Sequence, residues 1–558
     1  MRFRLGRRAM SAAGITVLAA AGLFPASAGA TTLTDTSTSC PSWVPAPGSM
    51  VGQPTSSVVV MAPTGVDVAG LVACAGGQVG IAYHVINAVA ATVPTVEEAD
   101  LETVSGVTLT PDVSVSVQST VASTSPHPGS DAFRAESGAN TLASAGDIGS
   151  GVTVAVLDTG IANLPDFSGR LIGGVDFTGE NNPFQDDYGH GTFVAGLVAG
   201  NGVSSNGQYE GEAPGANLVA IKVAGASGST DLATVIEGVD WAVVNRQAYG
   251  IQVLNMSLGF KPFTSTVVNP LDQAVEAAWN SGITVVTSAG NAGPFNGTVL
   301  SPGDDPVAIT VGAADDMGTP AIADDEMTDF SSVGPTNPDG WVKPDLATSG
   351  RSVISLADPG STVWTDYPSA RVGAANFVGS GTSFSAAITS GAAALVLAEN
   401  PSATPNEVKG RLLGTASTGP IGNPMADGHG LLNAEAAATS APLVYNQSVA
   451  GLSATAAGTT VALSPSSPVN SWDQSAWTGM AWTSSAWNGS AWNGSAWNGS
   501  AWNGLAWNGS AWNSSAWNGS AWNGLTWSGS AWNGSAWNSS AWNSSAWNSS
   551  AWNSSAWN

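Results

Sequence analysis

The central part of the chain, from residue 126 to residue 440, predicts an α/β protein with a mostly parallel sheet. Short apolar runs alternate there with segments of helical spacing, and several of the runs end in Gly or Asp. Strands of a parallel sheet are buried on both faces and need crossover helices to connect them. We therefore expect a sheet covered by helices on both faces, with ligands bound at the carboxyl ends of its strands.

The elements of this region follow in order along the chain. We expect strands at 152–157, 218–223, 252–256, 283–287 and 307–311, and helices at 195–199, 232–246, 271–280 and 384–398. The last of these helices consists mostly of Ala, Ser, Thr and Gly. Small residues on every side allow tight packing in all directions, so this helix should lie in the core.

The amino-acid composition excludes some classes of partner. Only 10% of the residues are charged and the net charge is −26. Such a chain is repelled by nucleic acid and by anionic membrane surfaces. We expect a soluble monomer without nucleic-acid partners.

The N-terminus predicts secretion. Four arginines within residues 2–8 precede an apolar run at 10–24, and Ala28-Gly-Ala30 follows. This is the pattern of a signal peptide, here residues 1–30. The alternative is a membrane anchor, but the apolar run is short for a bilayer span.

A propeptide-sized segment, residues 31–125, separates the signal peptide from the central domain. Its compact core at about 57–118 predicts strands at 58–61, 80–86 and 107–117 and a helix at 96–104. A loose linker rich in Ser and Pro follows. The two cysteines of the chain, Cys40 and Cys74, both lie in this segment and could form a disulfide.

The C-terminal part consists of a linker at 441–470 and a repeat tail at 471–558. A tryptophan recurs every five residues from Trp472 to Trp557, in units of Ser-Ala-Trp-Asn-Gly/Ser. A period of five matches neither one face of a helix nor one face of a strand. The tail is a spacer, an array whose indoles bind carbohydrate or cell wall, or an assembly or export element.

Three residues have the side chains that nucleophilic catalysis needs. Ser383 begins the small-residue helix, where backbone N–H groups lack partners, although a simple N-cap role is the alternative. Asp158 ends a buried strand, where a turn aspartate is the alternative. His190, between two glycines, is the best general base among the four histidines.

The three motifs together resemble the subtilases, the subtilisin-like serine peptidases. They are 156–161 (Val-Leu-Asp-Thr-Gly-Ile), 189–196 with Gly-His-Gly-Thr, and 381–384 (Gly-Thr-Ser-Phe), in the order Asp, His, Ser. The resemblance covers about 300 residues and implies a subtilisin-like three-layer fold. It implies a catalytic triad of Asp158, His190 and Ser383. It also implies that residues 31–125 are an inhibitor-like propeptide cut in the following linker.

The same resemblance implies further site residues. Asn291, in 287–291 (Thr-Ser-Ala-Gly-Asn), should hold the oxyanion together with the Ser383 backbone N–H. Ser257, Leu258 and Gly259 should pair with substrate and line one wall of the primary pocket. Ser288, Ala289 and Gly290 should form the opposite wall, and Gly228 should belong to a second substrate strand.

The chain departs from the usual family pattern around the substrate site. Phe193 replaces a frequent second histidine, Ala387 replaces a usual proline, and Thr348 begins a Thr-Ser-Gly segment in place of Ala-Pro-Gly. Leu300 falls where the pocket floor usually has glycine. We therefore expect a shallow primary pocket that prefers small side chains.

No cofactor is required for this chemistry, but subtilases often bind structural calcium. Asp176, Glu180, Asp186 and Asp187 offer oxygen ligands before His190. Their spacing is not that of a known calcium loop, so they do not assign a metal site, and an acidic surface loop is the alternative.

The sequence thus predicts a secreted serine endopeptidase made as an inactive precursor that processes itself. Its partners would be protein substrates, its own propeptide and, through the tail, a cell wall or polysaccharide. The alternative is a surface-associated binding or structural protein whose peptidase domain serves only its own processing or is inactive.

Overall fold

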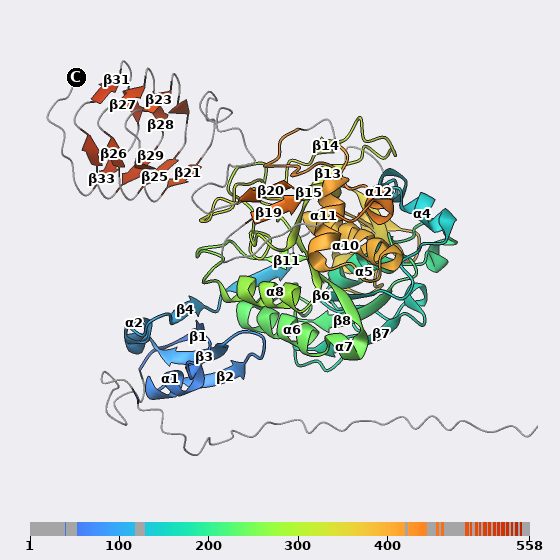
Figure 1. Cartoon of the computed structure of the whole chain (residues 1–558), viewed down its shortest axis with the longest axis horizontal. Coiled ribbons are helices and arrows are strands. Elements are labelled where there is room, and N and C mark those ends of the chain that lie inside the picture. The colour runs from blue at the N-terminus through green and yellow to red at the C-terminus, as the bar shows by residue number, and fades with distance from the viewer. Residues whose placement is uncertain are drawn as a thin grey trace, which may run out of the picture.

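The computed structural model describes residues 40, 53–117, 129–418 and 422–443, and the backbone of short strands between residues 453 and 549. Figure 1 shows the α/β domain with a smaller N-terminal module beside it. The expected signal peptide lies outside the described residues.

The centre of the domain is an eight-stranded sheet, mostly parallel, as the sequence predicts. Its order is β14-β13-β12-β10-β6-β8-β7, with β15 also paired to β13. Only β14 pairs antiparallel among these strands. The strands are β6 (Thr153–Asp158), β7 (Leu171–Asp176), β8 (Asn217–Lys222), β10 (Ile251–Met256), β12 (Thr284–Ser288), β13 (Ile309–Asp315), β14 (Glu326–Met327) and β15 (Leu346–Ser349).

Helices cover both faces of this sheet (Figure 1). The helices α5 (His190–Ala199) and α10 (Thr382–Glu399) lie on one face, and α6 (Leu232–Val244) and α8 (Pro270–Asn280) on the other. Within the described residues, α10 is the one helix long and apolar enough to cross a membrane, and it is 89% buried in the core. The small residues along it explain this burial, because the sheet backbone can approach closely.

Shorter helices connect and cap these elements. They are α3 (Phe133–Glu136), α4 (Ala139–Ala145), η2 (Pro165–Phe167), η3 (Val203–Ser205), α7 (Arg246–Tyr249), α9 (Thr362–Asp366), η4 (Pro368–Ala370), α11 (Pro405–Gly414) and α12 (Ala434–Thr439). A small antiparallel sheet formed by β16 (Val353–Leu356), β18 (Asn376–Gly379) and β17 (Arg371–Val372) leads into α10.

The order of the strands reverses between β6 and β10. From β6 the chain continues to β7 and β8 on one side, and from β10 it continues to β12 on the other. Open α/β sheets bind ligands at such a reversal, beyond the carboxyl ends of the strands. Asp158 ends β6 and Ser257 follows β10, so both lie at this point.

The N-terminal module is a four-stranded antiparallel sheet with helices packed on it. It contains β1 (Thr55–Met61), α1 (Val68–Cys74), β2 (Gln78–Ala82), β3 (Ala88–Pro94), η1 (Thr95–Glu97), α2 (Glu98–Glu102) and β4 (Thr108–Pro111), with the sheet order β2-β3-β1-β4. The module has its own apolar core, and Cys40 forms a disulfide with Cys74. The expected strand at 80–86 ends at Ala82, where the chain turns toward β3.

The expected strand at 107–117 is wrong in one respect, because it is two strands in different sheets. After β4 the chain passes Asp112 and Val113 and forms β5 (Ser114–Val117), which leaves the module. The side chain of Asp112 accepts a hydrogen bond from Ala233 N at the start of α6, which anchors this crossing.

The strands of the C-terminal part are described by their backbone alone. The strands β19 (Ser453–Ala456) and β20 (Thr459–Ala462) form an antiparallel pair. From β21 (Ala486–Gly489) to β33 (Trp547–Ser549), each strand pairs in parallel with the strand four repeats later, as in Ala486 with Ala506.

Candidate active site

A buried carboxylate–imidazole pair lies at the carboxyl edge of the sheet. Asp158 is the last residue of β6 and His190 the first of α5, and both are buried. His190 Nδ1 lies 2.7 Å from Asp158 Oδ1. A carboxylate accepts only, so Nδ1 carries the proton and Nε2 is left as the basic nitrogen. His190 Nε2 has no hydrogen-bond partner among the described residues.

Asp186 and Thr159 hold this pair in place. Asp186 Oδ1 accepts hydrogen bonds from Thr159 Oγ1 and Gly189 N, and its Oδ2 accepts one from Thr192 N, each at 2.7 Å. Thr159 N in turn donates to Asp158 Oδ1 at 2.8 Å. Burial raises the pKa of Asp186, and the hydrogen bonds from Thr159, Gly189 and Thr192 oppose that rise. The sequence offered Asp186 only as a metal ligand, so its positioning role was missed.

Ser383 lies beside the pair at the start of α10. It is fully buried, and its Oγ donates to the carbonyl oxygen of Ser257 at 3.0 Å. The ring of the next residue, Phe384, has its centroid 5.6 Å from that of His190. The structure therefore brings the three predicted catalytic residues together, with the serine hydroxyl turned toward β10 and its following turn.

Ser257 is tied to α10 by side chains as well. Its Oγ donates to Ser383 O at 3.0 Å and accepts from Asn255 Nδ2 at 2.9 Å. Asn255 Oδ1 accepts a hydrogen bond from Ser390 Oγ, which lies farther along α10. These buried bonds fix the N-terminus of α10 against the end of β10.

Asn291 is bound to the start of α10 through its amide oxygen. Its Oδ1 accepts hydrogen bonds from the N and Oγ1 of Thr382, both at 3.0 Å. Its Nδ2 is buried and has no hydrogen-bond partner in the described part of the chain. Because the oxygen is held, the amide cannot flip without losing both bonds, so the Nδ2 donor is fixed in its position.

The predicted substrate strands hold an extended segment of the same chain. β5 lies between β11 (Leu258–Gly259) and β9 (Ser229–Asp231), antiparallel to both. Leu258 pairs with Val117, whose N–H donates to Gly228 O at 3.1 Å. An extended peptide added as a strand is a common mode of peptide recognition.

The two predicted pocket walls lie on either side of Leu300. A Cβ on Gly290 would lie 2.6 Å from Leu300 Cγ, and one on Gly259 would lie 3.2 Å from Leu300 Cβ. Leu300 N donates to Ala289 O, which holds the leucine against the second wall, and Ser288 is buried beneath. The leucine side chain thus takes up room between the walls.

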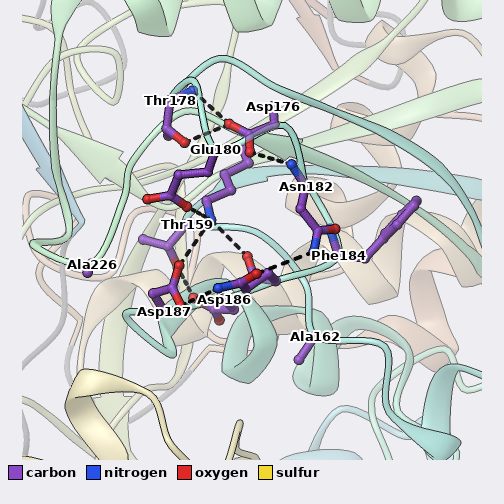
Figure 2. Close-up of polar contacts among 12 residues, drawn as sticks. Thr159, Ala162, Asp176, Thr178, Glu180, Asn182, Phe184, Asp186, Asp187 and Ala226 are labelled. Carbon is purple, nitrogen blue, oxygen red and sulfur yellow. Dashed lines mark hydrogen bonds and ion pairs between the residues drawn. The ribbon is translucent and has the colours of Figure 1, made fainter.

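The acidic residues before His190 do not fit together as a calcium site. Figure 2 shows the Asp176 carboxylate accepting hydrogen bonds from Thr178 and from Asn182 N. The oxygens of Asp186 are taken by protein donors, as described above. Among the described residues no group of three or more side chains is arranged to hold a metal.

The buried Lys222 ammonium forms ion pairs with the other two carboxylates of this loop, Glu180 and Asp187. Lys222 is fully buried at the end of β8, and its Nζ lies 2.5 Å from Glu180 Oε2 and 3.6 Å from Asp187 Oδ2. It also donates to Gln185 O at 3.0 Å. The loop between β7 and α5 is therefore closed around a cation that belongs to the chain itself.

The chain is similar in sequence to known proteins. The profile of the Subtilase family matches residues 149–468. Serine protease AprX of Bacillus subtilis (strain 168) is 44% identical over 292 residues, which are 51% of this chain and 66% of AprX, just under two thirds of that relative's length. Subtilisin NAT of Bacillus subtilis subsp. natto is 33% identical over 302 residues, covering 54% of this chain and 69% of the relative.

The fold is also found among solved structures. Fervidolysin from Fervidobacterium pennivorans superposes with a TM-score of 0.55 at 23% identity, covering 70% of this chain and 62% of that one. At this identity the likeness shows the fold alone. With the match of the family profile over more than half of the chain, we conclude that the protein belongs to the subtilase family.

Proposed function

We propose that the protein is a secreted serine endopeptidase that hydrolyses peptide bonds through an acyl-enzyme. The observation that carries the proposal is the buried Asp158–His190 pair beside Ser383, with the Asn291 Nδ2 donor free for a developing oxyanion. These groups are what the acyl-transfer mechanism of serine peptidases requires.

The proposed reaction follows from the positions of these groups. His190 Nε2 takes the Ser383 proton as the serine oxygen attacks the substrate carbonyl, and Asp158 stabilises the imidazolium. Asn291 Nδ2 and the Ser383 N–H hold the oxyanion. His190 then protonates the leaving amine. In the second half of the reaction His190 takes a proton from water, the water oxygen attacks the ester carbonyl, and the proton passes to Ser383 Oγ as the ester bond breaks.

The proposal includes synthesis as a zymogen. β5 occupies the position of a substrate strand, and the N-terminal module is bound to α6 by several hydrogen bonds. A segment seated there blocks the site, so residues 31–125 act as an inhibitor until they are cut and released. The linker in which the cut would fall, like the signal peptide, lies outside the described residues.

Leu300 supports a preference for small side chains at the residue before the scissile bond. In the proposed pocket it fills space between Gly259 and Gly290. For the repeat tail we propose retention on insoluble cell wall or polysaccharide, which a pull-down of chains with and without residues 471–558 would test.

The deciding experiment compares secretion of the wild type and of Ser383→Ala. N-terminal sequencing and casein digestion follow for each. We expect only the wild type to lose its N-terminal module and to digest casein. If both lose it equally and neither digests casein, another protease does the processing and the domain is a scaffold.

A further inference from the structure

We propose that Ser390 is a positioning residue for the attacking serine, and that it acts through Asn255 and Ser257 on the backbone of Ser383. The proposal rests on the peptidase function proposed above and adds to it a residue about two helical turns away from the reacting atoms. All four side chains are fully buried, so water does not compete for the hydrogen bonds that join them.

Ser257 binds Ser383 at two atoms. Its carbonyl oxygen accepts a hydrogen bond from Ser383 Oγ, and its own Oγ donates one to Ser383 O, each at 3.0 Å. The first bond involves the attacking oxygen, and the second holds the backbone of Ser383 in the first turn of α10. Loss of the second bond therefore frees the Ser383 backbone, whose N–H the proposed reaction uses to hold the oxyanion.

The Ser257 hydroxyl has a single proton, and the use of this proton decides the direction of the neighbouring bonds. Because the proton is donated to Ser383 O, Ser257 Oγ can only accept from its other neighbour. Asn255 Nδ2 is that donor, at 2.9 Å. If the Asn255 amide were turned over, its oxygen would face Ser257 and compete with Ser383 O for the same proton.

Ser390 selects the orientation of the Asn255 amide. Ser390 Oγ donates to Asn255 Oδ1 at 2.9 Å, so the amide oxygen faces α10 and the amide NH₂ group faces Ser257. Without the Ser390 hydroxyl, this orientation loses the hydrogen bond to its oxygen. The reversed amide, which takes the Ser257 proton away from Ser383 O, then becomes more populated.

The backbone of Asn255 is the fixed part of this arrangement. Asn255 belongs to β10, inside the central sheet, and pairs there with Val156 of β6 and Val286 of β12. Ser390 lies on the same side of α10 as Ser383, because seven residues are close to two helical turns. The sheet thus positions the start of α10 through the side chains of Asn255 and Ser257.

Sulfonylation of Ser383 tests the proposal without an extended substrate. Phenylmethanesulfonyl fluoride forms a bond from its sulfur to Ser383 Oγ, the sulfur–fluorine bond breaks, fluoride leaves, and His190 takes the serine proton. The rate constant of this reaction measures how well the serine is placed. Hydrolysis of a peptide p-nitroanilide by the fully processed protein gives kcat and KM in parallel.

In Ser390→Ala we expect the sulfonylation rate and kcat to fall about fivefold to tenfold, with KM within about twofold, because a buried hydrogen bond is lost and the substrate strands are untouched. Ser390→Cys, which is similar in size and a weaker donor, should lie between Ser390→Ala and the wild type. Thr389→Val is the matched control. It removes the neighbouring buried hydroxyl, which has no hydrogen-bond partner among the described residues, and should keep both rates within about twofold of the wild type.

A double variant shows whether Ser390 acts through Ser257. Ser257→Ala removes the hydroxyl but keeps the carbonyl group that accepts from Ser383 Oγ. In that background Ser390→Ala should lower the two rates by less than about twofold, because the bond that Ser390 supports is already gone.

Three results would overturn the proposal. They are rates in Ser390→Ala that match those of Thr389→Val, a loss that appears in KM alone, and a loss that persists in full in the Ser257→Ala background. Should Ser390→Ala not fold, the comparison of Ser390→Cys with Thr389→Val decides in the same way. A wild type that reacts with neither the sulfonyl fluoride nor the peptide would instead refute the proposed function.

Discussion

At the scale of single residues, two buried polar atoms lack partners within the described residues at the place where the proposed reaction needs them. His190 Nε2 and Asn291 Nδ2 have no hydrogen-bond partner there, whereas the other end of each side chain is firmly bonded. An unsatisfied buried donor or acceptor is unfavourable by about 1–3 kcal/mol, so such atoms are rarely kept without a use. Both side chains lie next to the start of α10, since His190 packs near Phe384 and Asn291 is bonded to Thr382.

Replacement of Asn291 by Ala tests the oxyanion role. We expect kcat to fall by about 10²–10³-fold with KM within about threefold, because the lost donor acts on charge that develops in the transition state. Steady-state kinetics on a peptide substrate measure this. Asn296→Ala, in the exposed loop that follows, should leave kcat unchanged. A loss of less than about tenfold in Asn291→Ala would contradict the role.

The Lys222 ammonium lies against Glu180 and Asp187, two of the acidic residues that the sequence offered as calcium ligands. Lys222→Met removes the ammonium and leaves Glu180 and Asp187 facing each other without a counter-charge. We expect the free energy of unfolding to fall by about 1–3 kcal/mol. This is below the usual range for breaking a fully buried ion pair, because both carboxylates are partly exposed. Urea unfolding in a Ser383→Ala background, which prevents self-digestion, measures it.

The control for that experiment is Lys261→Met, which removes the same charge from an exposed position. It should change stability by less than about 0.5 kcal/mol. Equal stability of the two variants would show that the loop does not depend on Lys222.

At the scale of elements, helix α6 binds the N-terminal module through several hydrogen bonds. Asp240 Oδ1 accepts from His84 N at 2.7 Å and Val85 N at 2.8 Å, and its Oδ2 lies 2.7 Å from His84 Nδ1. Tyr83 Oη donates to Ala233 O on the same helix. Asp240 thus makes three contacts to the module through one buried carboxylate.

Asp240→Ala should weaken the hold of the module. Loss of charged hydrogen bonds of this kind is worth about 2 kcal/mol, or about thirtyfold in affinity. We expect proteolytic activity to appear earlier after the precursor is cut, followed with a chromogenic peptide. Glu237→Ala, on the same helix and without these three bonds, should keep the wild-type lag. An unchanged lag in Asp240→Ala would refute the contact.

Some elements could be predicted from the sequence and others could not. β6, β8, β10 and β12 were found within one or two residues because each is a short apolar run. β7 was missed because Gly173 and Gly174 break its apolar pattern. β5 was joined to β4, because alternation continues through both strands and says nothing about which sheet each one enters.

At the scale of the whole molecule, buried carboxylates link stability to pH. Glu212 is fully buried, Ser137 Oγ donates to its Oε1 at 2.6 Å, and its Oε2 has no partner among the described residues. Burial raises the pKa of Glu212 from 4.5 to about 7, against the opposing effects of Ser137 and Arg134. Between about pH 4.5 and pH 7 the folded protein therefore binds more protons than the unfolded chain. This contribution to stability is complete below about pH 4.5 and is lost as pH rises through about 7.

Glu212→Gln should remove this dependence. We expect the variant to be more stable than its parent by about 1–3 kcal/mol at pH 8 and equal to it at pH 4, measured by urea unfolding in the Ser383→Ala background. Glu399→Gln, an exposed change on α10, should show no such difference between the two pH values. A variant less stable than its parent at pH 8 would show that the carboxylate is bound as an ion.

The sequence by itself determined the α/β class, the family and the three residues of the proposed triad. These depend on the period of apolar residues and on short motifs, both of which are local properties of the chain. Only the tertiary structure decided that Asp186 supports the Asp158–His190 pair, that Lys222 faces the loop carboxylates and that β5 lies between β9 and β11. Each of these depends on hydrogen bonds or ion pairs between residues far apart in the chain, such as Thr159 with Asp186 or Val117 with Gly228, and no local pattern encodes such a pairing.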